Sequence, residues 1–179
     1  MVIPIIIKKA KQQKRLRLEN IKDKVSSARY VPNKSPWSLD DPLPCDFAFP
    51  CATQNEINGP MAKQLIEKSG CRGFFEGANL PITLDGQDTI RSFPDKVIYI
   101  PGKAANAGGV GVSGLEMAQN SQRLQWKRDD VDAKLQDMMN EIYTQMEQNQ
   151  GDDGSLETGA NRAGFIKVAN AMRELGHIW

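Results

Sequence analysis

The sequence is poor in the side chains from which metal and nucleophilic sites are built. It contains one histidine, His177, and three cysteines, Cys45, Cys51 and Cys71. Three thiols cannot all pair within the chain, and one histidine completes neither a zinc-type ligand set nor a Ser/His/Asp or Cys/His catalytic set. The sequence supports neither a disulfide framework nor a metal site. A reducing compartment is expected, the cytoplasm first and the mitochondrion as the alternative.

A surplus of basic charge and a long hydrophobic run are also missing. The 23 Lys and Arg residues nearly balance the 22 Asp and Glu residues, which gives a net charge of +1. Neutralising many phosphates takes a surplus of Lys and Arg, so this balance argues against a nucleic-acid partner. The opening apolar run, Val2 to Ile7, is interrupted by Pro4 and stops at Lys8. It is far short of the ~20 apolar residues that span a bilayer, so no membrane partner is expected.

The length of 179 residues suits one domain or part of a larger one. Along this length the charge is unevenly distributed. Eight basic residues and two acids up to Lys24 give that segment +6 and leave −5 for the rest. A solvated basic helix or an unusual chain start explains it better than a targeting signal, because it contains acids and lacks a small-residue cleavage site. Five prolines between Val31 and Pro50 exclude a continuous helix there.

From residue 46 onward one pattern occurs three times: a short apolar run enters a polar loop of small residues, and a helical or irregular stretch follows. The predicted strands are Asp46–Phe49, Gly73–Phe75 and Lys96–Ile100. The predicted loops are Pro50–Asn55, Glu76–Pro81 and Pro101–Gly109, and the helical spacing after the first loop covers Ile57–Lys68. Strands that alternate with helices pair in parallel, because a tight turn cannot reach a parallel neighbour. The pattern predicts an α/β fold with a parallel sheet.

After Gly109 the chain is predicted to be helical to its end. One helix is expected over Leu115–Trp126, and a second is expected to begin at Asp129 or Asp130, either of which can cap it. The apolar face of this second helix consists of Val131, Leu135, Met138, Ile142 and Met146. A polar loop over Gln148–Thr158 precedes a last helix, which Gly176 ends. The apolar stripe of the last helix consists of Phe165, Ile166, Ala169, Met172 and Leu175.

The three polar loops share a chemistry that suits a ligand. In an open parallel sheet, ligands bind beyond the carboxyl ends of the strands, where all three loops fall. Their glycines permit close backbone approach, and their carboxamides donate and accept hydrogen bonds without adding charge. These residues are Thr53, Gln54, Asn55, Gly77, Asn79, Gly102, Asn106, Gly108 and Gly109. Two interpretations stay open: turn formers at strand ends, or one shared face for a neutral-amide ligand such as a nicotinamide.

The stretch Gly109–Gly114 matches the dinucleotide fingerprint G-x-G-x-x-G letter by letter. That fingerprint works when its first glycine directly follows a strand and a second strand with an acid follows the helix. Here the loop Pro101–Gly108 intervenes and helix is expected afterwards, which disfavours the fingerprint. The alternative is that these glycines let a helix N-terminus near Ser113 to Leu115 approach an anion.

Side chains for acid–base or nucleophilic catalysis are scarce in the loops. Glu76 and Lys103 are the ionisable candidates, and each is expected to be structural, as a charge that caps or bridges loops. Cys51 has no basic partner nearby in sequence, so an inert thiol is expected.

Four long stretches resemble one protein family. They are DFAFPCATQNEINGPMAKQLI, GFFEGANLPITLDG, VIYIPGKAANAGGVGVSGLEMAQNSQRLQW and TGANRAGFIKVANAM. Together they resemble the C-terminal part of a glutamate dehydrogenase, most of all the small hexameric type that is often NADP-dependent, over roughly Trp37 to Gly176. This resemblance implies the second half of a Rossmann-type parallel sheet followed by C-terminal helices. The expected domains are a basic N-terminal segment over residues 1–36, a partial dinucleotide-binding domain over 37–112 and a helical segment over 113–179.

The same resemblance implies a face for NADP, or NAD, on the loops. The residues that match it are Ala52, Thr53, Gln54, Ala78, Asn79 and Asn106. Ala52, Thr53 and Gln54 resemble the loop beside the cofactor's ribose and pyrophosphate. Ala78 and Asn79 resemble the pair near the nicotinamide ribose, and Asn106 resembles the carboxamide that meets the nicotinamide end. For the substrate, Ser113 resembles the hydroxyl that binds the side-chain carboxylate, and Val110 resembles a wall of the pocket.

Several parts of the family's machinery lie upstream of the matched stretches: the catalytic Lys and Asp, the substrate-domain glycine motif, the true dinucleotide fingerprint and the residue that separates NAD from NADP. The family's full enzyme, a homo-hexamer, converts glutamate reversibly to 2-oxoglutarate and ammonia. This chain is expected to supply only the nicotinamide half of the cleft, as a fragment or split product. The alternative is a truncated, non-catalytic protein that binds nucleotide or contacts subunits. Half a parallel sheet leaves an edge strand and one face uncovered, so poor folding of the chain alone is expected.

Overall fold

The structure is a computed structural model that describes residues 25, 30–32 and 34–176. It divides into two compact units, Met1–Leu39 and Asp40–Trp179, which are described separately. In the first unit a short 3-10 helix, η3, spans Pro36–Ser38 and is capped by the hydroxyl of Ser35. The basic segment predicted up to Lys24 lies outside the described residues.

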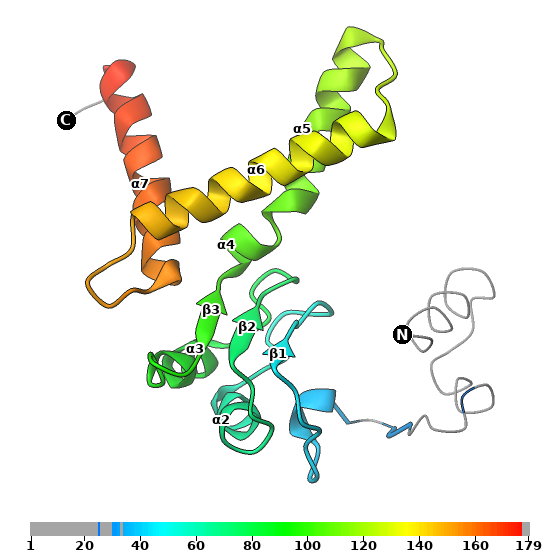
Figure 1. Cartoon of the computed structure of the whole chain (residues 1–179), viewed down its shortest axis with the longest axis vertical. Helices are drawn as coiled ribbons and strands as arrows, with labels where there is room; N and C mark the ends of the chain where they lie inside the picture. Colours follow the sequence, from blue (N-terminus) through cyan, green and yellow to red (C-terminus); the bar gives the residue numbers. More distant parts are fainter. Residues whose placement is uncertain (1–24, 26–29, 33, 177–179) are drawn as a thin grey trace. The chain divides into compact units, whose positions relative to one another are not determined.

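Three short parallel strands form the sheet of the second unit (Figure 1). The strands are β1 Phe47–Ala48, β2 Gly73–Phe75 and β3 Ile98–Ile100, in the order β1-β2-β3. Both neighbouring pairs are parallel, which confirms the predicted α/β class. The first and third strands are shorter than the sequence indicates, because β2 pairs with both and has only three residues.

Two crossover helices connect the strands, and side chains cap both of them. Helix α2 spans Gly59–Glu67 behind the cap Asn58, and helix α3 spans Leu84–Arg91 behind the cap Thr83. The Asp85 carboxylate in the first turn of α3 accepts a hydrogen bond from the first amide of α2 at 2.8 Å. The bonds from the Thr83 side chain and from that amide hold the pKa of Asp85 below its usual value. These contacts fix where the two helices begin relative to each other.

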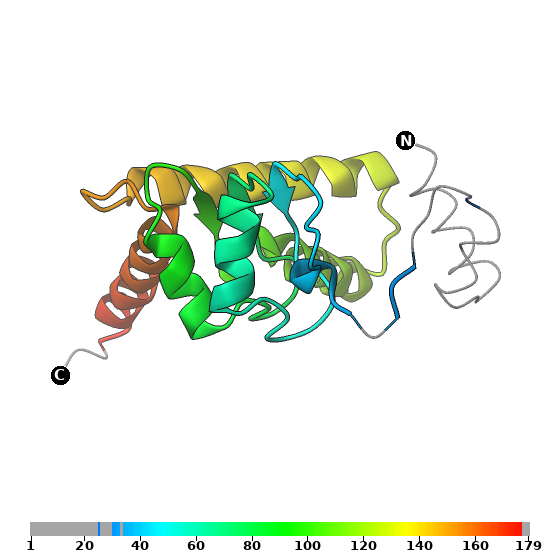
Figure 2. The same cartoon turned by 90° about the horizontal axis from the view of Figure 1, so that it is seen from below.

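The sheet has one buried face and one exposed face. Ala48, Phe74 and Tyr99 lie side by side in the register and are 1%, 0% and 8% exposed. On the opposite face, Phe47 and Ile98 are 48% and 51% exposed. Helices α2 and α3 lie next to each other (Figure 2), and right-handed crossovers put both on one side of a parallel sheet. The exposed apolar face is the one that the resemblance to half of a larger sheet predicts.

Beyond β3 the chain turns helical earlier than the sequence predicts. Helix α4 spans Gly102–Ala105 and helix α5 spans Ala107–Gln122. The prediction of a loop over Pro101–Gly109 was therefore wrong, and the helix expected from Leu115 already begins at Ala107. Glycine disfavours helix by local propensity. Packing of this stretch against the next long helix overrides that propensity.

Helix α6 spans Arg128–Gln148, and helix α7 spans Leu156–Glu174. The prediction that Asp129 or Asp130 caps α6 was wrong. Lys127 occupies the cap position without a side-chain hydrogen bond, and both acids lie in the first turn. There they interact favourably with the amide dipoles of the helix start.

The long helices bury few of their side chains. Helix α5 has no buried residue, α6 buries Met146 and α7 buries Gly159. The predicted stripe on α7 is open to solvent, since Phe165 and Leu175 are each 74% exposed. Gly176, with a φ of 74°, ends α7 as predicted. Among the described residues, no helix is long and apolar enough to cross a membrane.

Candidate functional site

The loops that follow the three strands meet at the carboxyl end of the sheet. The amides of Gly77 and Ala78, after β2, both donate to the Pro50 carbonyl, after β1, at 3.1 and 2.9 Å. The Asn106 carboxamide, after α4, donates to the Ala78 carbonyl at 3.1 Å and to the Asn79 carboxamide oxygen at 2.9 Å. Residues far apart in sequence therefore form one hydrogen-bonded cluster, here called the strand-end cluster (residues 50–56, 76–80 and 102–106).

In the first loop, Ala52, Thr53 and Gln54 are exposed. The amides of Ala52 and Thr53 donate to one carboxylate oxygen of Glu56, at 2.9 and 3.3 Å. Asn55, in the left-handed region with a φ of 54°, donates its amide to a carbonyl of the second loop. Sequence reasoning missed Glu56. A carboxylate a few residues after two loop amides was the available signal, because such a side chain can fold back onto them.

A cavity of about 360 Å³ opens behind the Asn79–Asn106 pair. Its polar lining includes Glu76, Gln87 and Lys103 as well as the two carboxamides. Glu76 is 2% exposed, and one of its carboxylate oxygens accepts from the Gly102 amide at 2.7 Å. The exposed Lys103 ammonium donates to Asn161 on α7. Both charged side chains bridge elements, as the sequence predicts for structural charges.

Val110 and Ser113 lie apart from the cluster, on α5. Asn106 occupies the N-cap position of this helix without a side-chain capping bond, so Val110 and Ser113 lie about 6 and 10 Å from it along the axis at 1.5 Å per residue. Val110 is 74% exposed. The Ser113 hydroxyl donates to the Gly109 carbonyl one turn earlier, at 3.2 Å. The predicted helix N-terminus at Ser113 was wrong, because the helix starts at Ala107 and the amide of Ser113 lies in its interior.

One glycine of the G-x-G-x-x-G match, Gly111, serves helix packing together with Gly108, the residue just before the match. A Cβ at Gly108 would approach Leu135 and Met139 to 3.1 and 3.3 Å, and a Cβ at Gly111 would overlap the Met138 side chain. Gly108 and Gly111 thus let α5 approach α6 closely. A Cβ at Gly109, by contrast, would meet no atom within 4 Å. The disfavoured fingerprint is excluded, since its first glycine lies inside a helix rather than directly after a strand.

The described cysteines differ in their surroundings. Burial raises the pKa of the Cys71 thiol to about 11, and its sulfur donates to the Gly73 carbonyl at 3.3 Å. Cys51 is exposed on the first loop and Cys45 is half-buried. Buried thiols with a raised pKa are poor nucleophiles, so Cys71 is a core residue.

The model of the Glutamate/Leucine/Phenylalanine/Valine dehydrogenase family matches residues 3–176. The chain belongs to this family. The match covers almost the whole chain and includes every residue of the strand-end cluster. It confirms the resemblance predicted from the sequence.

Curated members of the dehydrogenase family are similar over most of this chain. A glutamate dehydrogenase of Bacteroides thetaiotaomicron is 48% identical over 152 residues, which are 83% of this chain and 32% of that protein. The NADP-specific glutamate dehydrogenase of Escherichia coli K12 is 46% identical over 151 residues, which are again 83% of this chain and 32% of that protein. This chain therefore spans about a third of the length of these relatives.

A solved family member has a similar fold. The structure of Plasmodium falciparum glutamate dehydrogenase 2 matches with a TM-score of 0.83 at 43% identity, over 96% of this chain and 37% of that one. The three-stranded parallel sheet and the helices that follow it thus correspond to part of the fold of this glutamate dehydrogenase.

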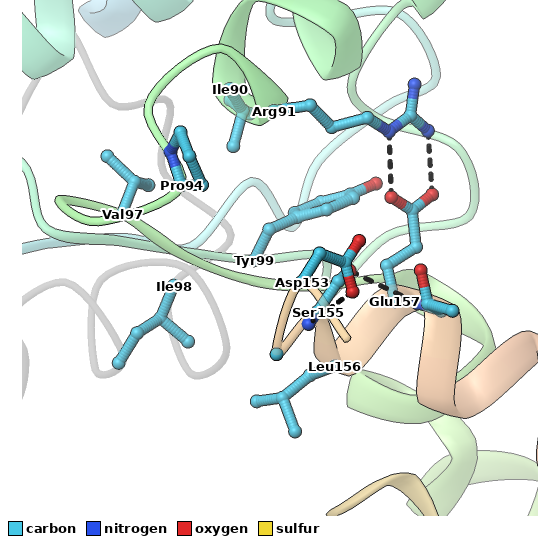
Figure 3. A pocket seen from close by; sticks show the side chains of 12 residues that line it. Ile90, Arg91, Pro94, Val97, Ile98, Tyr99, Asp153, Ser155, Leu156 and Glu157 are labelled. Atoms are coloured by element: carbon cyan, nitrogen blue, oxygen red, sulfur yellow. Dashed lines mark hydrogen bonds and ion pairs between the residues drawn. The ribbon is translucent and has the colours of Figure 1, made fainter. Parts of the chain in front are cut away.

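A second cavity, of about 270 Å³, lies between the α3–β3 connection and the start of α7 (Figure 3). At its edge the Arg91 guanidinium on α3 donates two hydrogen bonds to Glu157 on α7, at 2.9 and 2.7 Å. This pairing raises the pKa of Arg91 further above its ordinary value. The Tyr99 ring lies beside the pair, and burial is the main cause of its raised pKa. The Arg91–Glu157 pair thereby joins α7 to α3.

Proposed function

We propose that this chain is the C-terminal, cofactor-binding portion of a glutamate dehydrogenase. The reaction would be the NADP- or NAD-dependent, reversible oxidative deamination of glutamate to 2-oxoglutarate and ammonia. The observation that carries the proposal is the Asn79–Asn106 pair, joined at 2.9 Å across two strand-end loops. Two neutral carboxamides that donate and accept suit a nicotinamide amide and its ribose hydroxyls. The NADP-specific name of the Escherichia coli relative supports NADP as the first cofactor to test.

The crowding at the strand ends also fits a nicotinamide cofactor. A Cβ at Gly102 would approach the Ala78 carbonyl and the Asn106 nitrogen to 3.2 Å, so glycine keeps the backbone close to the carboxamide pair. Thr53, Gln54 and Asn79 are exposed and accessible to a ligand. When bound, NADP would supply the hydride acceptor. The residues of this chain would bind and orient its nicotinamide end, with Ala52, Thr53 and Gln54 toward the ribose and pyrophosphate.

The substrate would lie along α5, next to the nicotinamide. Val110 and Ser113 follow Asn106 on the same helix, and the open space beside Gly109 leaves room for a small ligand. The Ser113 hydroxyl can rotate from the Gly109 carbonyl to donate to a carboxylate. Val110 would form an apolar wall. We assign substrate binding, and no proton transfer, to these two residues.

The catalytic acid–base groups would come from the part of the enzyme that this chain does not include. The region that matches this chain is 32% of each of the two curated relatives described above. In the full enzyme the substrates would be glutamate, 2-oxoglutarate and ammonia, and the assembly would be a homo-hexamer.

Complementation tests this proposal. The chain would be co-expressed with the portion of the Escherichia coli relative that precedes its matched region. The chain alone is expected to reduce no NADP with glutamate, whereas the pair is expected to do so. Turnover by the chain alone would refute the division of roles. A pair that associates and binds NADPH without turnover would favour a binding or subunit-interaction module.

Side-chain truncations in the active pair test the site residues. Ser113→Ala is expected to raise the KM for glutamate about tenfold or more, the value of a hydrogen bond to a charged group, with little change in the KM for NADP. Asn79→Ala is expected to do the reverse. Ser121→Ala, an exposed serine on the same helix, is the matched control and should change neither. Exchanged effects of the first two variants would overturn the assignment.

A further inference from the structure

Glu76 makes a buried contact that the proposed chemistry does not use. It directly follows β2, and its backbone amide continues the sheet by donating to the Ile100 carbonyl at 3.2 Å. Its side chain turns inward, and the residue is 2% exposed. One carboxylate oxygen accepts the 2.7 Å bond from Gly102, the first residue of α4. The strand end and the next helix are therefore joined by a charge-assisted hydrogen bond shielded from water.

This bond substitutes for a helix cap. Pro101 occupies the cap position of α4 and has no side-chain acceptor to offer. The Glu76 carboxylate reaches across from the neighbouring strand and satisfies the amide that the proline leaves free. Helix α4 has only four residues, too few to hold its position by its own hydrogen bonds. Its placement depends on the contacts at its two ends.

At the other end of α4 lies Asn106. Its backbone amide donates to the Gly102 carbonyl at 3.0 Å, and its side chain makes the two bonds to Ala78 and Asn79. Gly102 is thus held at both of its backbone polar groups. Its amide donates to Glu76, and its carbonyl accepts the hydrogen bond from the Asn106 amide. A shift of Gly102 would move the carboxamide that the proposed function aims at the nicotinamide.

The second carboxylate oxygen of Glu76 is buried and has no hydrogen-bond partner among the described residues. The nearby Tyr99 hydroxyl is affected by this carboxylate, which adds to burial in raising the pKa of Tyr99. A buried carboxylate with one partner destabilises a fold more than a neutral acceptor would. A carboxamide at this position, as in Glu76→Gln, could accept the hydrogen bond from the Gly102 amide without burying a charge. The effect of the acceptor oxygen can therefore be measured separately from the effect of the charge.

We infer that Glu76 is a positioning residue: its carboxylate fixes α4 and thereby holds the Asn106 carboxamide against Asn79 in the orientation that binds the nicotinamide end of the cofactor. It acts through Gly102 and Asn106 and touches no reacting atom. This inference rests on the proposed function for its ligand, while the positioning itself concerns this chain alone.

Hydrogen exchange in the full 179-residue chain tests the positioning without any ligand. In Glu76→Ala, the Gly102 amide is expected to exchange at least about tenfold faster, while amides in α2 keep their rates, because only the local bond is lost. Glu76→Gln retains an acceptor oxygen and should restore most of the protection. Tyr99→Phe is the matched control, since it removes the neighbouring hydroxyl and leaves the bond to Gly102. An unprotected Gly102 amide in the parent chain, or equal protection in Glu76→Ala, would overturn the inference.

A double-mutant cycle on NADPH binding tests the route of action. Glu76→Ala and Asn106→Ala are each expected to weaken NADPH binding to the complemented pair about tenfold. The double variant is expected to be no weaker than Asn106→Ala alone, because Glu76 acts through Asn106. Additive losses would refute this route. If the parent pair binds no NADPH, the proposed function fails, and the exchange pattern at Gly102 still decides whether Glu76 positions α4.

Discussion

The sheet with its two crossover helices and the three long helices after Asn106 are built from similar shares of apolar residues, yet they bury them differently. The first region encloses large side chains completely, among them Phe74, Ile57, Ile82 and Ile90. Among the described residues of the long helices, Met146, 3% exposed, is the only large side chain that is buried, whereas Phe165, Val110 and Met117 are 69% to 74% exposed. The sheet region has a hydrophobic core of its own, whereas the long helices leave many of their large apolar side chains exposed to solvent.

This difference indicates what each region contributes. The region with a core positions the strand-end cluster, whose bonds run between loops and need a fixed scaffold. The long helices carry several exposed large apolar side chains, which are typical of interaction surfaces when they lie together. The exposed sheet face is a further apolar surface open to solvent. On it the ring centroids of Phe47 and Phe49 lie 5.7 and 5.0 Å from that of Phe75. Both surfaces are consistent with a chain about a third as long as its relatives.

The largest expected effect separates the two regions directly. Phe74→Ala should destabilise the sheet by about 3–5 kcal/mol, because it removes a fully buried ring. Phe165→Ala on α7, matched in chemistry and 74% exposed, should change stability by less than about 0.5 kcal/mol. Hydrogen exchange of the β2 amides measures both. Equal losses would mean that the helices have a core that the structure lacks.

An intermediate effect concerns the link between the regions. The Arg91–Glu157 pair joins α3 to α7 with two bonds, and the Glu157 side chain is 15% exposed. A double-mutant cycle with Arg91→Gln and Glu157→Gln should give a coupling of about 1 kcal/mol, measured by exchange in the first turn of α7. The control pair Arg72–Asp46, with side chains 67% and 69% exposed, should couple more weakly. A smaller coupling for Arg91 than for Arg72 would contradict the link.

The smallest effect is a pH dependence confined to the region with a core. The folded-state pKa of Cys71 is raised by burial from 9.0 to about 11, so the thiolate forms more readily in the unfolded chain. The stability from the neutral thiol is fully present below about pH 9 and is lost as the pH rises toward 11. Cys71→Ala should flatten the fall in stability over this window, and the exposed Cys51→Ala should not. Chemical denaturation at several pH values would measure the slopes.

The sequence predicted the sheet well and the stretch after β3 poorly. Apolar runs bounded by small polar residues correctly located all three strands, because side-chain periodicity and turn residues act locally. The stretch Pro101–Gly109 was predicted to be a loop, because the local propensity of its glycines disfavours helix. In the structure, Leu135 and Met139 of α6 leave little room for a side chain at Gly108, and Met138 leaves none at Gly111. These contacts join residues far apart in sequence.

For the site, the same division holds. The chemistry of the loops, glycines with carboxamides and little charge, could be read from composition. The bonds of Asn106 to Ala78 and Asn79, and the role of Glu56 in binding two loop amides, required the fold.

The sequence by itself determined the α/β class, the three strands, the family and the glycines and carboxamides of the strand-end loops, since these follow from local patterns and long ordered matches. The tertiary structure alone decided that Glu76 caps a helix from a neighbouring strand, that the Gly109–Gly114 match lies in a helix, and that the stripe of α7 stays exposed. Each of these depends on which distant segments come into contact, and a pattern along the chain does not contain that information.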